Sequence, residues 1–175
     1  MLPAILQTHL EYSAWASREL VAAASRLSAG ELTRDFGTAD RSVLGTLAHV
    51  FGADRIWLAR VTGAPVQKLT DRDRDIAVLQ NEWPELQARW KEWARALTVE
   101  SAAEVLSYTD LRGNPWSQPL WQIVLHVVNH GTHHRGQAAG FLRAMRHTPP
   151  PLDLIHYYRE MAKPVPRSGR PSASS

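Results

Sequence analysis

Residues 121–146 have the sequence WQIVLHVVNHGTHHRGQAAGFLRAMR and carry the clearest structural signal in the chain. Their apolar residues recur every three or four positions, which is the spacing of an amphipathic helix. Four of the chain's eight histidines lie in this stretch: His126, His130, His133 and His134. We therefore expect a long helix over about 117–146 with histidines along one side.

The direction of the apolar face separates these histidines. At about 100° per residue, His126, His130 and His134 follow one side of the helix in steps of about 40°. The large apolar residues centre about 105° round from His126, so that His130 and His134 lie nearest the core and His126 and His133 lie at or past its edge. Spacing alone allows His126/His130 or His130/His134 to bind one metal ion, and the core direction favours the second pair. A hydrogen-bonded structural role for core histidines stays open beside metal binding.

A metal site on this helix needs a third ligand from elsewhere in the chain. His49 is the best candidate, because small residues one turn away would let another helix approach: Gly45, Thr46, Gly52 and Ala53. His9 is a second candidate, although a core position or a place next to the ligands suits it better.

The histidine helix lacks an acidic residue. No Asp or Glu occurs between Asp110 and Asp153, so the base of an HExxH metalloprotease is absent. Arg135 and Arg143 are candidates for orienting a substrate carboxylate, although solvated helix faces also carry arginine. Asp54 is a candidate for a buried hydrogen-bond acceptor beside the ligands or for a salt bridge at a helix end.

The rest of the chain shows the same helical period. We expect helices over about 3–28, 41–61 and 79–97, and a short last helix over 152–162. The stretch 28–40 is typical of a loop, and 104–119 has the alternation of a short hairpin. Pro84 should begin or kink the third helix, because proline lacks the backbone donor. Four long helices with short connections indicate an all-α helical bundle.

Composition limits the class of protein further. The chain has 175 residues, which is the size of one domain. It has no cysteine, so disulfides and cysteine-ligated metals are excluded. The net charge of +3 comes from Lys163, Arg167 and Arg170, which follow the last acidic residue, Glu160. Residues 1–162 are thus balanced in charge, and we expect no nucleic-acid partner. We expect a domain over 1–162 and a disordered basic tail over 163–175.

The tryptophans and the N-terminal residues are also typical of a helical protein without a membrane span. Trp15, Trp57, Trp83, Trp90 and Trp93 sit at helical spacing and are expected to pack in the core. The first residues lack the basic lead and cleavage site of a signal peptide, and no stretch has the length of an apolar membrane span. We therefore expect a cytoplasmic protein with no membrane partner.

Three segments resemble one known family. LHVVNHGTHHRGQAAGFLR (125–143) closely resembles the fourth-helix signature of the DinB/YfiT-like family of small bacterial proteins, including its NHxxxHRGQ core. EYSAWASREL (11–20) is similar to the opening of the family's first helix, and LAHVFGADRIWLAR (47–60) is similar to its second-helix pattern.

The resemblance implies an up-up-down-down four-helix bundle, which the short C-terminal helix expected over 152–162 follows. It also implies a divalent ion, Zn²⁺ or Ni²⁺ above all, held by His49, His130 and His134. Members of the family commonly form homodimers, and some are transferases or isomerases that use small thiols. The expected function is thus a metal-dependent enzyme acting on a small molecule, of the thiol-dependent S-transferase or hydrolase type. The alternative is a non-catalytic metal-binding or scaffold protein of the stress or DNA-damage response.

The resemblance leaves the substrate and the catalytic residues unknown. The segments 29–40, 63–75 and 104–119 are expected to lie around the open side of the metal and to set substrate choice.

Overall fold

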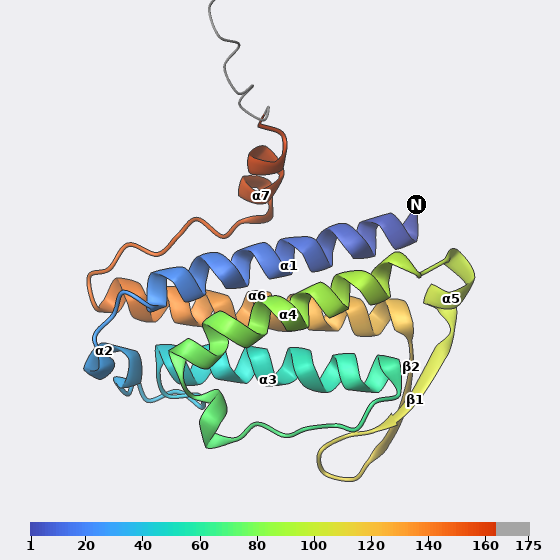
Figure 1. The fold of residues 1–175 in the computed structure, drawn as a ribbon, viewed down its shortest axis with the longest axis horizontal. Helices are drawn as coiled ribbons and strands as arrows, with labels where there is room; N and C mark the ends of the chain where they lie inside the picture. The colour runs from blue at the N-terminus through green and yellow to red at the C-terminus, as the bar shows by residue number, and fades with distance from the viewer. Residues whose placement is uncertain (164–175) are drawn as a thin grey trace, which may run out of the picture.

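Four long helices make up most of the structure, a computed structural model that describes residues 1–163 (Figure 1). They are α1 (Leu2–Ala24), α3 (Val43–Thr62), α4 (Ile76–Arg95) and α6 (Leu120–Ala144). α3 ends at Gly63, whose left-handed backbone (φ 69°) favours glycine. The prediction of long helices is confirmed, whereas the predicted tail lies, from residue 164 onward, outside the described residues.

Short elements connect the long helices. They are α2 (Ala29–Thr33), a 3₁₀ turn (Asp71–Asp73), α5 (Val99–Ala103), β1 (Val105–Thr109), β2 (Pro115–Pro119) and the last helix α7 (Leu154–Met161). The five-residue helices α2 and α5 were not expected from the sequence. Each begins with a capping box, at Ser28 and Thr98, and each is too short to show a hydrophobic period.

The predicted hairpin is present, so the fold is mostly helical and the expectation of a purely all-α protein is wrong. β1 and β2 pair antiparallel, from Val105 opposite Pro119 to Thr109 opposite Pro115. Asp110 holds the connecting turn, because its carboxylate accepts hydrogen bonds from Asn114 and Trp116. The hairpin lies where α3 ends and α6 begins (Figure 1).

The helix directions differ from the up-up-down-down order implied by the resemblance. α1 and α4 are antiparallel, since Gln7 near the start of α1 donates a hydrogen bond to the carbonyl of Ala94 near the end of α4. α3 and α4 are parallel, because the connection over 63–75 runs back along α3 before α4 begins (Figure 1). α6 is antiparallel to α3 and runs with α1. The order is therefore up-down-down-up.

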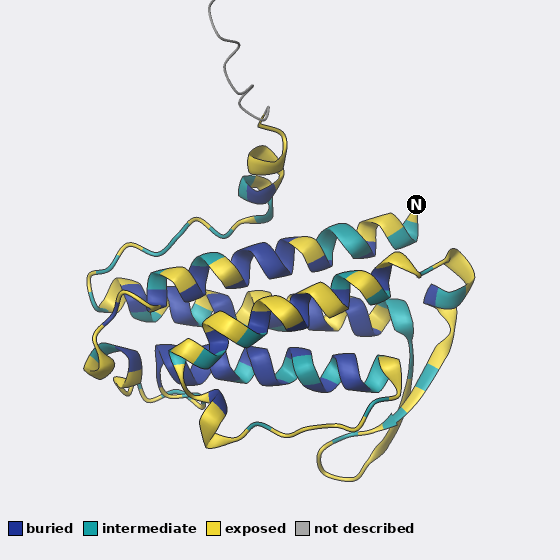
Figure 2. Ribbon diagram, in the orientation of Figure 1, coloured by how far each residue is buried: buried dark blue, intermediate teal, exposed yellow. Residues whose placement is uncertain are grey.

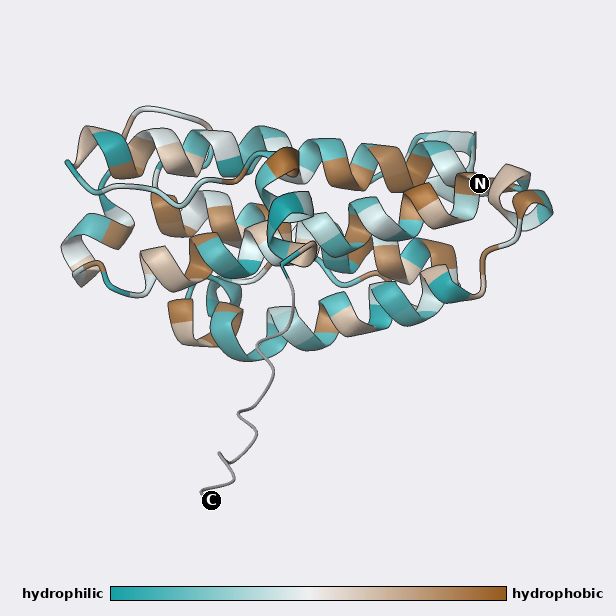
Figure 3. Ribbon diagram, turned by 90° about the horizontal axis from the view of Figure 1, so that it is seen from above, coloured by the Kyte–Doolittle hydropathy of each residue, from teal (hydrophilic) through white to brown (hydrophobic). Residues whose placement is uncertain are grey.

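Each long helix buries one face against its neighbours. α1 packs on α4 and α6, and α3 packs on the same two helices. Buried residues follow the inner faces, and hydrophilic residues follow the outer ones (Figures 2 and 3). Trp15, Trp83 and Trp90 are buried as predicted, whereas Trp57 and Trp93 are only partly buried. No helix of the described residues has the length and apolarity needed to cross a membrane.

A buried arginine joins α6 to α1. Arg135 is 1% exposed. Its guanidinium donates hydrogen bonds to the hydroxyls of Ser13, Ser17 and Thr132. The guanidinium folds back over Gly131, where a Cβ would lie 2.6 Å from Nη1 of Arg135. Gly131, at the first variable position of the NHxxxHRGQ signature, thus makes room for Arg135, the arginine of that signature.

Replacing Gly131 by alanine should therefore destabilise the protein by about 1–3 kcal/mol, because the new methyl group displaces a fully packed guanidinium. Gly140→Ala is the matched control on the same helix, since a Cβ there meets nothing within 4 Å. The control should stabilise the protein by about 0.5–1 kcal/mol through helix propensity. Urea unfolding measures both values, and equal effects of the two substitutions would contradict this account of Gly131.

Candidate metal centre

Three histidines from two helices meet in the groove between α3 and α6. His49 comes from α3, and His130 and His134 lie one turn apart on α6. One ring nitrogen from each residue lies within 4.8 Å of the other two, and Nε2 of His49 is 3.0 Å from Nε2 of His130. The structure thus brings together the three residues that the sequence and the resemblance singled out.

A glycine on α3 positions the loop beside these histidines. A Cβ on Gly45 would lie 2.0 Å from the main-chain oxygen of Asp40, so only glycine lets the loop pack against the first turn of α3. Ser42 caps that turn by accepting a hydrogen bond from the Gly45 N–H. The loop therefore carries the Asp40 carboxylate to the histidines.

The small residues of α3 have a different role from the predicted one. Gly45 makes room for the loop at Asp40, and Gly52 makes room for the side chain of Leu69, which would lie 2.9 Å from an added Cβ. These glycines admit connecting segments to the surface of α3. His49 reaches α6 because it lies on the face of α3 that packs against α6.

Asp40 lies beside the three histidines and was not predicted from the sequence. Its two carboxylate oxygens lie 3.5 Å from Nδ1 of His49 and 3.5 Å from Nδ1 of His134. No periodicity or motif marks Asp40, because a loop conformation brings it to the site. α6 carries no acidic residue, as the sequence shows, and the carboxylate beside the histidines comes instead from the loop before α3.

Hydrogen bonds fix which nitrogen the ligands present. Nδ1 of His134 donates to Oε1 of Gln137 at 2.8 Å, since an amide oxygen can only accept. The Asp40 carboxylate lies 3.5 Å from Nδ1 of His49, which is an ion-pair contact without a hydrogen bond. The bond to Gln137 places the ring proton of His134 on Nδ1, and the nearby carboxylate favours the same tautomer of His49, so that each Nε2 lone pair is free for a cation.

Burial keeps the imidazoles in the form that binds metals. Burial, reinforced by the neighbouring His134 and His49, lowers the pKa of His130 to about 3. Burial and the adjacent His49 also lower the pKa of His134, although Gln137 and Asp40 act in the opposite direction. The two rings are therefore neutral at pH 7, and neutral imidazole is a common metal ligand.

The donor set fits a divalent transition metal. Two nitrogens bound to one zinc ion at about 2.0–2.1 Å are at most about 4 Å apart. The observed spread of up to 4.8 Å is within a small side-chain rotation of that arrangement. Nε2 of His49 and Nε2 of His130 lie 3.0 Å apart, so one of them can donate a hydrogen bond to the other, and a bound cation would take the place of that proton. Three imidazoles also leave coordination positions for a further molecule.

The other histidines lie outside this cluster. His126 and His133 are exposed at the edge of the groove, in agreement with the predicted direction of the apolar face. His9, the second candidate for third ligand, instead makes a hydrogen bond to the carbonyl of Ile5 in its own helix. His147 pairs with Glu31 at 2.8 Å.

Two polar residues considered for the site lie in the core instead. Arg135 points into the contact between α1 and α6 and is unable to orient a substrate at the histidines. Asp54 accepts a hydrogen bond from Nε1 of Trp83, and its main-chain oxygen accepts one from Nε1 of Trp90. The alternative of a buried hydrogen-bond acceptor is thus confirmed for Asp54.

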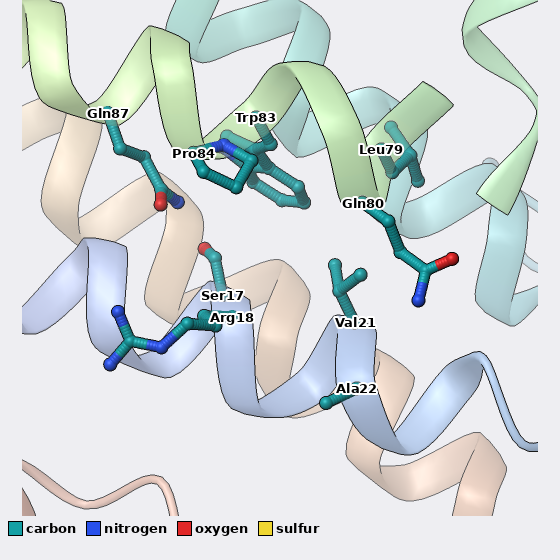
Figure 4. A pocket seen from close by; sticks show the side chains of 9 residues that line it. All are labelled: Ser17, Arg18, Val21, Ala22, Leu79, Gln80, Trp83, Pro84 and Gln87. Atoms are coloured by element: carbon teal, nitrogen blue, oxygen red, sulfur yellow. The ribbon is translucent and has the colours of Figure 1, made fainter. Parts of the chain in front are cut away.

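A pocket between α1 and α4 lacks the residues of a metal site. It is lined by Ser17, Arg18, Val21, Ala22, Leu79, Gln80, Trp83, Pro84 and Gln87 (Figure 4). Because α1 and α4 lie across the molecule from the contact between α3 and α6, this pocket opens on the opposite face from the histidines. α4 continues through Pro84 from Ile76, so the proline does not begin the helix.

Replacing Asp40 by alanine should weaken metal binding about 10- to 100-fold, the usual cost of removing a partner that orients ligands. Asp71→Ala is the control, because it removes an exposed acidic residue of another segment. Competition with a chromophoric chelator measures both affinities. Equal affinities of the two variants would exclude a role for Asp40 in orienting His49 and His134.

Comparison with known families agrees with this geometry. The model of the DinB family matches residues 1–166, which includes the three histidines and all the helices described above. No curated protein matches the chain.

Proposed function

The chain belongs to the DinB family, and from this premise we propose that it is a divalent-metal-dependent enzyme acting on a small molecule. The proposed ligands are His49, His130 and His134, with Zn²⁺ or Ni²⁺ as the ion. The observation that carries the proposal is the convergence of three ring nitrogens within 4.8 Å from two helices.

The surroundings of the histidines favour thiol-dependent transfer over hydrolysis. Among residues 1–163, Asp40 is the one carboxylate within 4 Å of the three rings. Its two oxygens face Nδ1 of His49 and Nδ1 of His134, so Asp40 would orient the rings rather than take a proton from a nucleophile. A bound divalent ion lowers the pKa of a thiol or water that it coordinates. A thiol needs the smaller shift, because its ordinary pKa is near 8.5.

The chain's own residues have three roles in such a reaction. His49, His130 and His134 would hold the ion through their ring nitrogens. Gln137 and Asp40 keep the rings of His134 and His49 in the orientation that presents Nε2. The side chain of His49 is 39% exposed, against 14% for His134, so the substrate approaches from the side of His49.

A transfer assay tests the catalytic proposal. Metal-loaded protein is incubated with bacillithiol, mycothiol, coenzyme A or cysteine and with monochlorobimane or an epoxide as the electrophile. We expect one thiol to be conjugated at a rate that falls to the uncatalysed value in His49→Ala and after chelation. A rate that is unchanged in His49→Ala, or no conjugation by any thiol with metal-loaded protein, would contradict it.

The position of the ligands on two helices favours a second candidate function. An ion held by α3 and α6 links these helices and would stabilise the fold, as a non-catalytic metal-binding or scaffold protein requires. A large drop in melting temperature on chelation, combined with no turnover, would support this alternative.

The same proposal covers the bundle, the cellular location, the oligomeric state and the partners of the protein. The four long helices are assigned to the four-helix bundle of the family, and the protein is assigned to the cytoplasm as a homodimer. Its proposed partners are a small-molecule substrate and a low-molecular-weight thiol.

A further inference from the structure

A separate cavity lies in the groove between α3 and α6, next to the three histidines. Its volume is about 280 Å³, and none of its lining residues is a proposed metal ligand. They are Trp57, Tyr108, Gln118, Gln122, Ile123 and His126. The hairpin β1–β2 thus closes one end of the groove with Tyr108 and Gln118.

Aromatic rings form most of the walls. The ring of Trp57 lies 5.0 Å from the ring of Tyr108 and 5.2 Å from the ring of His126. Both neighbours meet Trp57 edge-on, at 73° and 67°. Trp57 and Tyr108 are half-buried, and the buried Ile123 adds an apolar surface. Walls of this kind favour a flat apolar ring, because aromatic rings pack well edge-to-face and offset-stacked.

An arginine holds two of these rings in place. The guanidinium carbon of Arg60 lies 4.5 Å from the ring centre of Trp57 and 4.8 Å from that of Tyr108. The guanidinium also donates a hydrogen bond to the carbonyl of Thr109 at 3.0 Å, which ties the hairpin to α3. The walls are therefore preorganised, and preorganised walls bind with little loss of entropy. The positive charge of Arg60 favours a neutral or anionic occupant over a cationic one.

The cavity also contains a polar group without a partner. Oε1 of Gln118 is buried and accepts no hydrogen bond from the described residues. A buried acceptor without a partner costs free energy, and a donor on a ligand would satisfy it. An aromatic ring that carries a hydroxyl or N–H group has such a donor.

Neighbouring imidazoles connect the cavity to the metal centre. The ring of His126, in the cavity wall, lies 5.7 Å from the ring of His130, which is a proposed ligand. One turn of α6 advances about 5.4 Å. A molecule whose reactive atom reaches the ion can therefore place a second group in the cavity if a short spacer joins the two.

We propose that this cavity is the substrate-recognition subsite of the metal centre. It takes a flat aromatic group, neutral or anionic, joined by a short spacer to the atom that reacts at the histidines. This proposal rests on the proposed function, since it assigns the substrate class of the same site.

Binding of 2-naphthol to the metal-free protein tests the cavity alone. We expect saturable binding, seen by NMR as a shift of the Trp57 indole N–H signal. Trp57→Leu keeps an apolar side chain but removes the ring, and it should weaken binding about tenfold. Trp93→Leu is the matched control, because Trp93 is also partly buried but packs against Trp90 on α4. Absence of saturable binding, or equal loss in both variants, would overturn the proposal.

Hydroxamates test the link between the cavity and the metal. On cobalt-loaded protein, 4-phenylbutanohydroxamate should bind about tenfold more tightly than acetohydroxamate in the wild type and in Trp93→Leu. The two hydroxamates should bind equally tightly to Trp57→Leu. If the two hydroxamates bound equally tightly to the wild type, the subsite would be refuted, whereas the proposal of a metal centre would stand. Failure of acetohydroxamate to bind, with 2-naphthol still bound, would instead refute the proposed metal function.

Discussion

Replacing His130 by alanine is expected to lower bound metal from one ion per chain to less than about one tenth of that value at micromolar zinc. His130 is the proposed ligand one turn before His134 on α6, and its ring lies 4.9 Å from that of His49 and 4.5 Å from that of His134. Its loss leaves one ligand on each helix, with no pair one turn apart on α6. Metal analysis after dialysis gives the stoichiometry, and circular dichroism checks that the helices persist.

His126→Ala is the matched control for this substitution. His126 lies one turn from His130 on the same helix, but it belongs to the rim and the cavity wall rather than to the cluster. The control should retain one ion per chain. If the control lost metal as completely as His130→Ala, the assignment of ligands by the direction of the apolar face would be wrong.

Replacing Asp54 by asparagine is expected to make the protein about 3 kcal/mol more stable at pH 7. Burial raises the pKa of Asp54 from 3.8 to about 6, although the hydrogen bond from Trp83 and the charge of Arg135 oppose the shift. The folded state therefore keeps a proton that the unfolded state has lost. Each pKa unit is equivalent to about 1.4 kcal/mol. Asparagine does not ionise, and its amide oxygen still accepts the hydrogen bond from Trp83.

The sign of this effect gives a characteristic pH dependence. Well below the unfolded-state pKa of 3.8, Asp54 is protonated in both states and costs nothing. As the pH rises from 4 to 6, the unfolded state ionises first, so the free energy of unfolding of the wild type falls; above pH 6 the loss is complete. Urea unfolding of both proteins from pH 4 to 8 should show the two curves separating over pH 4–6. Parallel curves, or a less stable Asp54→Asn at pH 7, would contradict the raised pKa of Asp54.

The long helices and the pair of histidines on α6 follow from local sequence. The three- and four-residue spacing of apolar side chains sets both the helix limits and the face that turns inward, and this face distinguishes His130 and His134 from His126 and His133. The position of the third histidine, His49, depends on how α3 packs against α6. The sequence alone offered both His49 and His9 as the third ligand, and the family resemblance favoured His49.

Asp40, Arg135 and the helix directions could not be predicted in the same way. Asp40 reaches the histidines through a loop whose path depends on the missing side chain of Gly45. Arg135 looks like a surface residue of a polar helix, yet three hydroxyls and Gly131 accommodate it in the core. The up-down-down-up order depends on the path of 63–75, which has no periodic signal.

Anomalous diffraction from crystals grown with Zn²⁺ or Ni²⁺ tests the metal centre most directly. Data collected on both sides of the absorption edge should give one strong peak in the groove between α3 and α6. The peak should lie about 2.0–2.3 Å from one nitrogen each of His49, His130 and His134. A strong peak at His126 or His133 with none at these three residues, or no peak at all under metal saturation, would contradict the account.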